Sequence, residues 1–409
     1  MRCSMKKILL FFVFLYMLLS PVYPAKAQEE PPEVSSHAAI LVDASTGKII
    51  YEKNPDKKLE PASITKIMTA IVALENAELS DIVVTGKNPT LVEGTRIYLE
   101  EGEKLTLQQM LYALLLNSGN DAAVAIAEHV GGSVESFVDM MNNKAMEIGA
   151  LNITFVNPSG LSDEGHLSTA RDIAMITRHA IQNFPEFCKI VATKTLNIPW
   201  QGNEWDRKLQ NLNRLLWDYE GADGVKTGYT SSAGQTLVAT ATRNGWQLIA
   251  VLLKSETRPT LWNDAQNLLD YGFNNFQKYD VISSHKLITS AKVKYGEDVN
   301  LITTEDFSTV LPKGSTITQK VVLDNKLSAP ISKGQTLGKL EFYHGALKLD
   351  SVDLIAQNDV KRKIHTYWWF WPLFIAVLLY TPFKVFIGIR RYRRRKHQAR
   401  YISYLHRYK

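Results

Sequence analysis

Residues 61–66, Pro61-Ala62-Ser63-Ile64-Thr65-Lys66, place a serine and a lysine three positions apart at the start of an apolar run. Apolar residues recur at helical spacing as far as Leu74, which predicts a buried helix. Ser63 is expected in the first turn, where backbone N–H groups lie free and the helix dipole favours negative charge. Lys66 is expected on the same face, with its amine over the serine.

A serine hydroxyl is a poor nucleophile until a base takes its proton. A lysine can be that base when burial and nearby cations lower its pKa. The Ser-x-x-Lys pattern alone is weak, because it also starts at Ser4, Ser45 and Ser283. Those three lie in a leader segment, a tight turn and a short polar stretch, which fits a capping serine with a solvent-facing lysine. Ser63 differs in its setting and in two further motifs downstream.

The second motif, Ser118-Gly119-Asn120, interrupts two apolar segments. Residues 106–109, Thr-Leu-Gln-Gln, form a capping-box signature before one helical run, and a second helix is expected over 121–127. A loop between two such helices places Ser118 and Asn120 at the edge of a core. There a hydroxyl and an amide can share protons with the serine and lysine of the first motif. The alternative is an ordinary turn.

The third motif, Lys226-Thr227-Gly228, lies in strand-forming sequence. The alternating segment 235–242 predicts a half-buried strand, and Asn244-Gly245 predicts a hairpin turn into an apolar strand over 246–253. A lysine, a hydroxyl and a glycine on an edge strand can bind a substrate carboxylate while the backbone lies along a peptide. The alternative for this motif by itself is a solvated strand end.

The order Ser-x-x-Lys, Ser-x-Asn, Lys-Thr-Gly resembles that of the penicillin-recognising serine enzymes, in particular the low-molecular-mass D-alanyl-D-alanine carboxypeptidases of Gram-positive type. Segments 61–66, 118–129 and 157–161 look typical of that family. The resemblance covers roughly residues 36–275 with high specificity, and a following small β-domain with less. It implies an α/β (α+β) transpeptidase/β-lactamase-like domain, with the site between a five-stranded antiparallel sheet and a helical cluster.

The resemblance implies catalytic roles for four residues. Ser63 would be the acylated nucleophile and Lys66 its general base. Ser118 and Asn120 would relay protons and bind the substrate amide. The backbone N–H groups of Ser63 and Tyr229 would form the oxyanion hole, usually the largest electrostatic contribution in acyl transfer.

The resemblance also implies substrate contacts on the third motif. Lys226, Thr227 and Gly228 would meet the terminal carboxylate or its electrostatic surroundings. Some relatives have a histidine after Lys-Thr-Gly, where this chain has Tyr229; the backbone role needs only the N–H group. Arg258 is a further candidate for the carboxylate, but the sequence does not place it.

The N-terminus has the pattern of a signal peptide over residues 1–27. Basic residues precede an apolar core over 8–19, and Ala25-Lys26-Ala27 forms a cleavage site. The alternative is an N-terminal membrane anchor. Cleavage removes Cys3 and leaves Cys188 alone, so the mature chain can form no internal disulfide, which suits a Gram-positive cell surface.

Near the C-terminus, residues 367–389 are apolar and aromatic, enough to span a hydrocarbon core of about 30 Å as a transmembrane helix with a tryptophan cluster at the interface. The alternative is an amphipathic helix lying on the membrane. The basic tail, 390–409, predicts a cytoplasmic end and an extracellular catalytic domain.

The charge distribution disfavours a nucleic-acid partner. The chain carries a net charge of +6, yet residues 28–360 hold 30 Lys and Arg against 41 Asp and Glu. The excess of positive charge therefore belongs to the two membrane-associated ends. His129, His166 and His179 occur singly, without metal-ligand spacing, so no metal or other cofactor is predicted.

Between a catalytic domain at 28–275 and the terminal helix, residues 280–360 alternate like the strands of a small all-β domain of about six strands. Its expected role is to lift the active site off the membrane toward the wall, or to serve as a purely structural appendage.

The sequence thus predicts a membrane-anchored serine D,D-carboxypeptidase that removes the terminal D-alanine of peptidoglycan stem peptides through a Ser63 acyl-enzyme. This implies inhibition by β-lactams and a part in cell-wall biogenesis and cell shape. Three alternatives stay open: a D,D-endopeptidase, a β-lactamase, and a non-catalytic cell-wall or sporulation assembly protein. No Glu-x-x-x-Asn deacylation segment lies between the second and third motifs, which disfavours a β-lactamase, and the intact motifs disfavour a non-catalytic protein.

Overall fold

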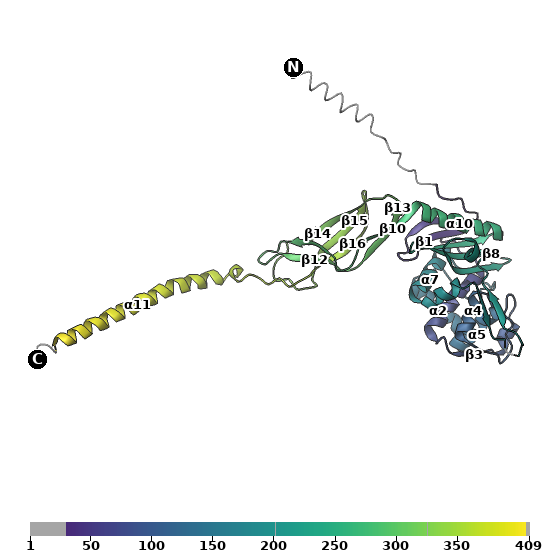
Figure 1. Cartoon of the computed structure of the whole chain (residues 1–409), viewed down its shortest axis with the longest axis horizontal. Helices are drawn as coiled ribbons and strands as arrows, with labels where there is room; N and C mark the ends of the chain where they lie inside the picture. Colours follow the sequence, from purple (N-terminus) through teal and green to yellow (C-terminus); the bar gives the residue numbers. More distant parts are fainter. Residues whose placement is uncertain (1–29, 201, 325, 406–409) are drawn as a thin grey trace, which may run out of the picture. The chain divides into compact units, whose positions relative to one another are not determined.

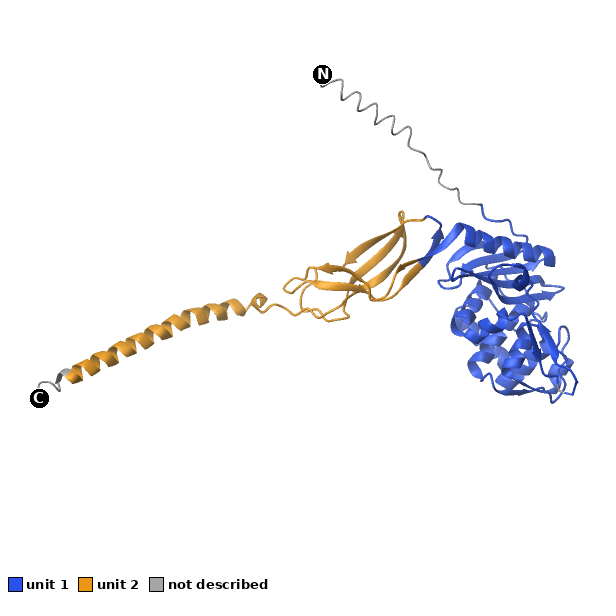
Figure 2. Cartoon of the chain, viewed as in Figure 1, with its two compact units in different colours: residues 1–279, 309–314 blue, residues 280–308, 315–409 orange. Residues whose placement is uncertain are grey.

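The structure, a computed structural model, describes residues 30–200, 202–324 and 326–405 (Figure 1). The predicted signal peptide, 1–27, lies outside them. The chain divides into two compact units, and each is described by itself (Figure 2). The first unit extends to Tyr279 and adds Thr309–Gly314; the second holds Asp280–Ser308 and the chain from Ser315 onward.

The first unit is built on a five-stranded antiparallel sheet in the order β2-β1-β9-β8-β7. Its strands are β1 (Ala38–Asp43), β2 (Ile49–Lys53), β7 (Ala222–Thr230), β8 (Gly234–Arg243) and β9 (Trp246–Ser255). The predicted hairpin is confirmed, because Asn244 and Gly245 both adopt positive φ, 52° and 76°, between β8 and β9. The third motif lies on β7, the edge strand, as predicted.

Both faces of this sheet are buried. Along β9, Ile249 and Val251 join the core under the helical cluster, while Leu248 and Ala250 pack against α10 (Arg258–Asn275). The expectation of a half-buried strand over 235–242 was wrong, because residues 236–241 are all buried. The helical cluster covers the face that the alternation had assigned to solvent, because Val238 lies in the core beneath that cluster and Thr236 donates to the Pro61 carbonyl.

The helical cluster covers the other face. It consists of a 3₁₀ turn, η1 (Ala62–Thr65), and of α2 (Lys66–Asn76), α3 (Lys87–Leu91), α4 (Leu107–Leu115), α5 (Asn120–Gly131), α6 (Val134–Ile148), α7 (Ala170–Asn183) and α8 (Pro185–Ala192). Helix α2 contacts α4, α5, α6 and α7, and is therefore the central helix. The predicted capping box of α4 is confirmed, because Gln109 N donates to Thr106 Oγ1 and Thr106 N donates to Gln109 Oε1.

Short elements join these layers. They are β3 (Ile82–Val84) paired with β4 (Lys104–Thr106), β5 (Thr195–Ile198) paired with β6 (Arg207–Gln210), and α9 (Leu215–Asp218). Helix α9 precedes β7 and contacts it. The segment that follows β6 therefore reaches the sheet edge that carries the third motif.

The second unit contains an antiparallel sheet in the order β11-β12-β16-β15-β14. Its strands are β11 (Leu287–Ala291), β12 (Val299–Thr303), β14 (Ile317–Leu323), β15 (Thr336–His344) and β16 (Leu347–Ala356). A separate pair joins β10 (Phe276–Ile282) to β13 (Phe307–Pro312), and most of its residues belong to the first unit. Leu301, Phe342 and Leu354 lie in the core of the second unit. The predicted order of an α/β catalytic part followed by a small all-β part is confirmed.

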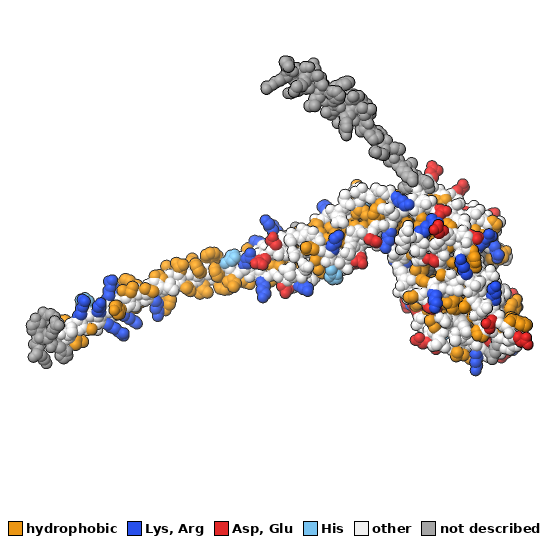
Figure 3. All heavy atoms as spheres, in the orientation of Figure 1, with side chains coloured by type: hydrophobic (Ala, Val, Ile, Leu, Met, Phe, Trp, Pro, Cys, Tyr) orange, Lys and Arg blue, Asp and Glu red, His pale blue; other side chains and the backbone are white. Residues whose placement is uncertain are grey.

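The chain continues through a 3₁₀ turn, η2 (Ile364–Thr366), into α11 (Phe370–Leu405). Residues Phe370–Ser403 form a helix long and apolar enough to cross a membrane. Figure 3 shows hydrophobic side chains along its first part and Lys and Arg side chains along its later part. The helix begins at Phe370 rather than at 367 and includes most of the basic segment expected as a separate tail.

Candidate active site

The first motif forms a tight turn at the start of the central helix. Ser63 lies in η1 and Lys66 is the first residue of α2, so Ser63 precedes the α-helix instead of lying in its first turn as expected. Residues three apart eclipse in a 3₁₀ turn. Lys66 Nζ accordingly lies 3.0 Å from Ser63 Oγ.

Lys66 is fully buried and is held by neutral oxygens. Its Nζ donates to Asn120 Oδ1 at 2.8 Å and to the Ser159 carbonyl at 2.6 Å. Burial, with the positive charge of Lys226 as the next cause, holds the pKa of Lys66 well below its usual 10.5. A neutral amine has two N–H donors and one lone pair, so two carbonyl acceptors leave the lone pair for the Ser63 hydroxyl.

The second motif joins α4 to α5, and its Ser118 lines the same cavity as Ser63. Ser118 adopts a left-handed φ of 63° and is 4% exposed. Asn120, the first residue of α5, donates from Nδ2 to the Glu93 carbonyl at 2.7 Å, and its backbone N donates to the Thr95 carbonyl at 2.7 Å. Because both amide ends of the side chain are used, Asn120 presents its oxygen to Lys66 in one orientation.

The third motif brings a second buried lysine to the site. Lys226 is 1% exposed and its Nζ donates to the Thr227 carbonyl at 3.1 Å. Burial lowers the pKa of Lys226 to about 7. Two buried lysines therefore share this region, and each has an amine that loses its proton far more readily than a surface lysine does.

Two glycines allow backbones to meet around Ser63. A Cβ on Gly228 would lie 2.8 Å from Ser63 N, and a Cβ on Gly160 would lie 1.9 Å from the Ala62 carbonyl oxygen. Gly160 also has a φ of +80°. The turn that carries Ser63 therefore packs closely between β7 and the 157–161 segment.

The same segment leads to His166, which is buried beneath the turn. Val156 N donates to His166 Nδ1 at 3.1 Å, so Nε2 carries the proton and lies 2.9 Å from Thr65 Oγ1. Burial lowers the pKa of His166 to about 4, which keeps the ring neutral. Its role is to fix the turn beside Ser63, and among the described residues no cluster of His, Cys, Asp or Glu is arranged to hold a metal ion.

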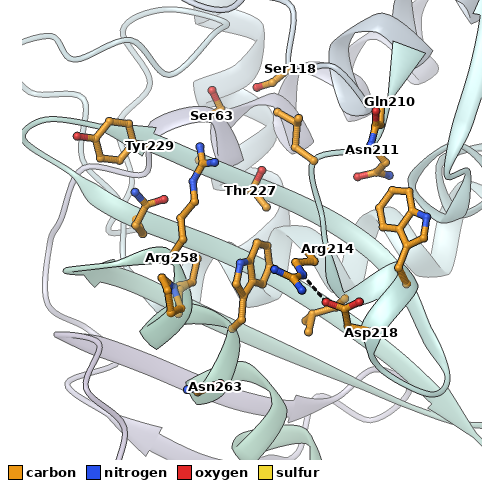
Figure 4. A pocket seen from close by; sticks show the side chains of 18 of the residues that line it. Ser63, Ser118, Gln210, Asn211, Arg214, Asp218, Thr227, Tyr229, Arg258 and Asn263 are labelled. Atoms are coloured by element: carbon orange, nitrogen blue, oxygen red, sulfur yellow. Dashed lines mark hydrogen bonds and ion pairs between the residues drawn. The ribbon is translucent and has the colours of Figure 1, made fainter. Parts of the chain in front are cut away.

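A cavity of about 910 Å³ opens beside these residues (Figure 4). Its walls include Ser63, Ser118, Thr227, Gly228 and Tyr229, while Lys66, Asn120 and Lys226 are buried. The structure thus brings all eight predicted site residues to one place. It also places Arg258, at the start of α10, in the cavity wall.

The sequence alone missed three contributors to the site. The Ser159 carbonyl, His166 and Asp121 act from outside the three motifs. Asp121 is fully buried and accepts from the backbone N of Ile97 and of Leu99, which fixes the segment that follows Glu93. For the Ser159 carbonyl, the only sequence signal was the family-typical segment 157–161, Asn-Pro-Ser-Gly-Leu. Residue type alone cannot assign a role to a backbone oxygen.

Comparison with known proteins agrees with this geometry. Residues 25–257 match the family model of D-alanyl-D-alanine carboxypeptidases, and residues 276–362 match that of the C-terminal domain of penicillin-binding protein 5. The chain is 34% identical to the D-alanyl-D-alanine carboxypeptidase DacF of Bacillus subtilis, over 88% of this chain and 95% of that protein.

Two further relatives cover most of the chain. DacC of Escherichia coli is 34% identical, over 85% of this chain and 90% of the relative. The crystal structure of penicillin-binding protein 5 from Haemophilus influenzae matches with a TM-score of 0.74 and 33% identity, covering 82% of this chain and all of that one. With its motifs gathered around one cavity and similarity over both units, the chain belongs to the D-alanyl-D-alanine carboxypeptidase family of serine peptidases.

Proposed function

We propose that Ser63 is the nucleophile that removes the terminal D-alanine from peptidoglycan stem peptides. The observation that carries the proposal is the environment of Lys66, whose lone pair is left to the Ser63 hydroxyl by two carbonyl acceptors. Lys66 takes the hydroxyl proton while Ser63 Oγ attacks the carbonyl carbon of the penultimate residue. The backbone N–H groups of Ser63 and Tyr229 stabilise the oxyanion.

The amide then breaks and the D-alanine nitrogen takes a proton through Lys66 and Ser118. Water attacks the Ser63 ester, and the proton it releases returns to Ser63 Oγ. The shortened peptide leaves with a free carboxylate. Asn120 holds Lys66 in place throughout, since its side-chain oxygen is already oriented toward Nζ.

The carboxylate of the departing D-alanine is assigned to the Thr227 side of the cavity. Thr227 offers a hydroxyl, Arg258 offers a guanidinium, and Lys226 lies buried beneath the strand. Penicillins and other β-lactams carry a carboxylate close to a reactive carbonyl and would acylate Ser63 by the same route. Their leaving nitrogen stays tethered, so they act as covalent inhibitors.

Helix α11 is proposed to anchor the enzyme by crossing the membrane once. Its apolar first part suits the hydrocarbon core, and its Lys and Arg side chains suit the cytoplasmic face, which would leave the catalytic unit outside the cell. Along the chain, the sheet of the second unit lies between the catalytic unit and this helix.

The test uses the full-length protein in detergent, a fluorescent penicillin and a defined pentapeptide ending in D-Ala-D-Ala. Mass spectrometry should show loss of one D-alanine, and the penicillin should label the protein covalently. Ser63→Ala should abolish both, whereas Ser45→Ala, in another Ser-x-x-Lys sequence, should change neither. Persistent labelling of the Ser63 variant would refute the nucleophile, and an unlabelled, inactive wild-type protein would favour a non-catalytic role.

A second variant tests the base. Lys66→Ala should slow acylation by several powers of ten, because it removes the proton acceptor. Near-normal acylation with a normal melting curve would assign the base to another group.

A further inference from the structure

Three basic residues stand immediately before the terminal helix. They are Lys361, Arg362 and Lys363, and α11 begins at Phe370. If α11 crosses the membrane in the proposed orientation, this segment lies at the outer surface, where Lys and Arg are normally few. The seven Lys and Arg residues in 390–400 are enough to determine the orientation. The three outer cations are therefore not needed for topology.

Arg362 is held in one position by its neighbours. Its guanidinium carbon lies 4.7 Å from the ring centres of both Tyr295 and Tyr367, and cation–π attraction stabilises both contacts. Nε donates to Thr366 Oγ1 at 3.2 Å, and Nη2 donates to the Thr366 carbonyl at 2.8 Å. Among the described residues, Nη1 has no hydrogen-bond partner. The guanidinium is thus fixed and still has N–H groups free for a ligand.

A second cation, from a distant segment, lies against the same ring. Lys294 Nζ is 4.5 Å from the ring centre of Tyr295. A hydrogen bond from Lys294, with the charges of Lys294 and Arg362 in addition, lowers the pKa of Tyr295. Two like charges are gathered around one ring, which is unfavourable unless an anion joins them. The two acidic residues that follow, Glu297 and Asp298, form no ion pair with either cation within the described parts of the chain.

The backbone brings these two segments together. Lys363 N donates to the Tyr295 carbonyl at 2.8 Å, and Lys294 makes two backbone hydrogen bonds with the 327–329 segment. Tyr295 adopts a left-handed φ of 65°, which is unusual for a large side chain and costs free energy. Strained backbone of this kind is concentrated at ligand sites. The cations therefore belong to a folded end of the second unit and not to a loose linker.

Aromatic rings continue from this point toward the helix. Tyr367 stacks on Trp369 with ring centres 5.8 Å apart, and Trp368 is 86% exposed. Tyr and Trp side chains favour the boundary between lipid headgroups and hydrocarbon. In a chain anchored by α11, the cations next to these rings therefore lie at the level of the lipid phosphates.

We propose that this end of the second unit binds the phosphodiester of an anionic phospholipid in the outer leaflet, a proposal that rests on α11 being the anchor. The residues of this juxtamembrane site are Lys294, Lys361, Arg362 and Lys363. One free phosphodiester oxygen accepts from the Arg362 Nη1 group and the other from Lys294 Nζ. The anion removes the repulsion between the two cations, and the bound lipid fixes the second unit against the membrane surface.

The experiment uses the full-length protein in lipid nanodiscs with a phosphatidylglycerol that carries a photoreactive headgroup. Mapping of the cross-linked peptides by mass spectrometry separates the juxtamembrane site from the basic segment 390–400. The wild type should cross-link within 292–296 or 361–367. Lys294→Gln combined with Arg362→Gln should lower this yield at least tenfold and leave the yield at 390–400 unchanged, because each cation lost near an anionic surface weakens binding about fivefold.

Matched variants test whether position matters. Lys286→Gln combined with Lys320→Gln removes the same charge from exposed positions elsewhere in the second unit and should leave the yield unchanged. An equal fall in both double variants would refute the site, because net charge alone would then explain the binding. Lys294→Gln by itself leaves the Arg362 stack in place and should lower the yield about fivefold; it replaces the double variant if that protein melts early.

Two further comparisons identify the ligand. A photoreactive phosphatidylcholine, which has no net charge, should label the juxtamembrane site far less, and equal labelling by both lipids would overturn the inference. Inorganic phosphate at millimolar concentration should not compete, and full competition would mean that the site takes soluble phosphate instead of lipid. Insertion into nanodiscs without cross-linking at this site would refute the inference alone, whereas failure to insert would refute the proposed anchor as well.

Discussion

Strand β7 and the turn that carries Ser63 meet through their backbones, because a Cβ added to Gly228 would lie 2.8 Å from Ser63 N. The same Cβ would lie 2.4 Å from Thr236 Oγ1 on the neighbouring strand. Neither a backbone atom nor a strand-bound hydroxyl can move freely. The oxyanion hole proposed between Ser63 and Tyr229 depends on this close approach.

Gly228→Ala should therefore separate β7 from η1 and slow acylation at least tenfold, which corresponds to about 1.4 kcal/mol of lost transition-state stabilisation. Stopped-flow measurement with a chromogenic β-lactam checks this, with thermal melting as the control for folding. Unchanged acylation in a folded variant would show that the two backbones need not be this close.

The two buried lysines should be coupled in the pH profile of acylation. Lys66 can act as the proposed base only when it is neutral, and the charge of Lys226 helps to lower the pKa of Lys66. Lys226→Gln removes that charge, so the pKa of Lys66 should rise. The acidic limb of the plot of acylation rate against pH should therefore move to higher pH, whether or not the maximal rate also falls. A limb that stays in place or moves to lower pH would contradict the coupling.

His166 should make stability fall in mild acid. Its pKa is about 4 in the folded protein, against an ordinary value of 6.5. As the pH falls the unfolded chain binds the proton first. The stabilisation is therefore complete above pH 6.5 and is lost as the pH falls toward 4, by about 3 kcal/mol. Urea unfolding of the wild type and His166→Asn at several pH values checks this, and equal pH dependence in both proteins would contradict it.

The buried ion pair between Arg207 and Glu103 should be costly to break. Their side chains are 6% and 2% exposed, the Arg207 Nη1 to Glu103 Oε1 distance is 2.9 Å, and the guanidinium lies 4.7 Å from the ring of Trp200. Glu103→Leu leaves a buried charge and should destabilise the protein by about 3–5 kcal/mol. Adding Arg207→Met should restore part of that loss in denaturant unfolding. A double variant no more stable than Glu103→Leu would show that the unpaired charge is not the cause.

A chain ending at Val360 should be soluble and should still react with penicillin, because the three motifs all precede residue 230. Activity on small peptides should survive, while activity on intact walls should fall as the enzyme loses its surface concentration. Gel filtration and fluorescent labelling check the first point. A cooperatively folded fragment that fails to label would show that α11 helps to form the site.

The sequence predicted the parts of the site that depend on side-chain type and spacing. The three motifs, the capping box at Thr106 and the hairpin at Asn244 all carry local signals. The Ser159 carbonyl carries none, because every residue has a carbonyl, and only the folded chain shows which one meets Lys66. Nor could the sequence place Arg258 at the cavity.

The error over 235–242 has a physical cause. Thr236, Thr240 and Thr242 share one face of that segment and Leu237, Ala239 and Ala241 share the other, a pattern that normally marks a strand with one solvent-exposed face. Thr236 and Thr240 are nevertheless buried, and the Thr236 hydroxyl donates to the Pro61 carbonyl beside the turn that carries Ser63. A threonine hydroxyl that donates to an acceptor can be buried. The alternation of polar and apolar residues therefore did not indicate which face is exposed to solvent.

The pairing of β1 with β9 joins two strands far apart in the chain, so the central sheet is complete only after β9 has been synthesised. Ala38 lies opposite Leu253 and Asp43 opposite Leu248, so a strand made early in synthesis waits for one made near the end of the catalytic unit. Until β9 is made, β1 has only β2 as a neighbour, and the sheet that carries the third motif on β7 is incomplete. Pairing between distant segments slows folding and leaves an unpaired, aggregation-prone strand edge exposed in the meantime. A nascent chain cut short before β9 should therefore be a substrate for chaperones and proteases, never a partly working peptidase.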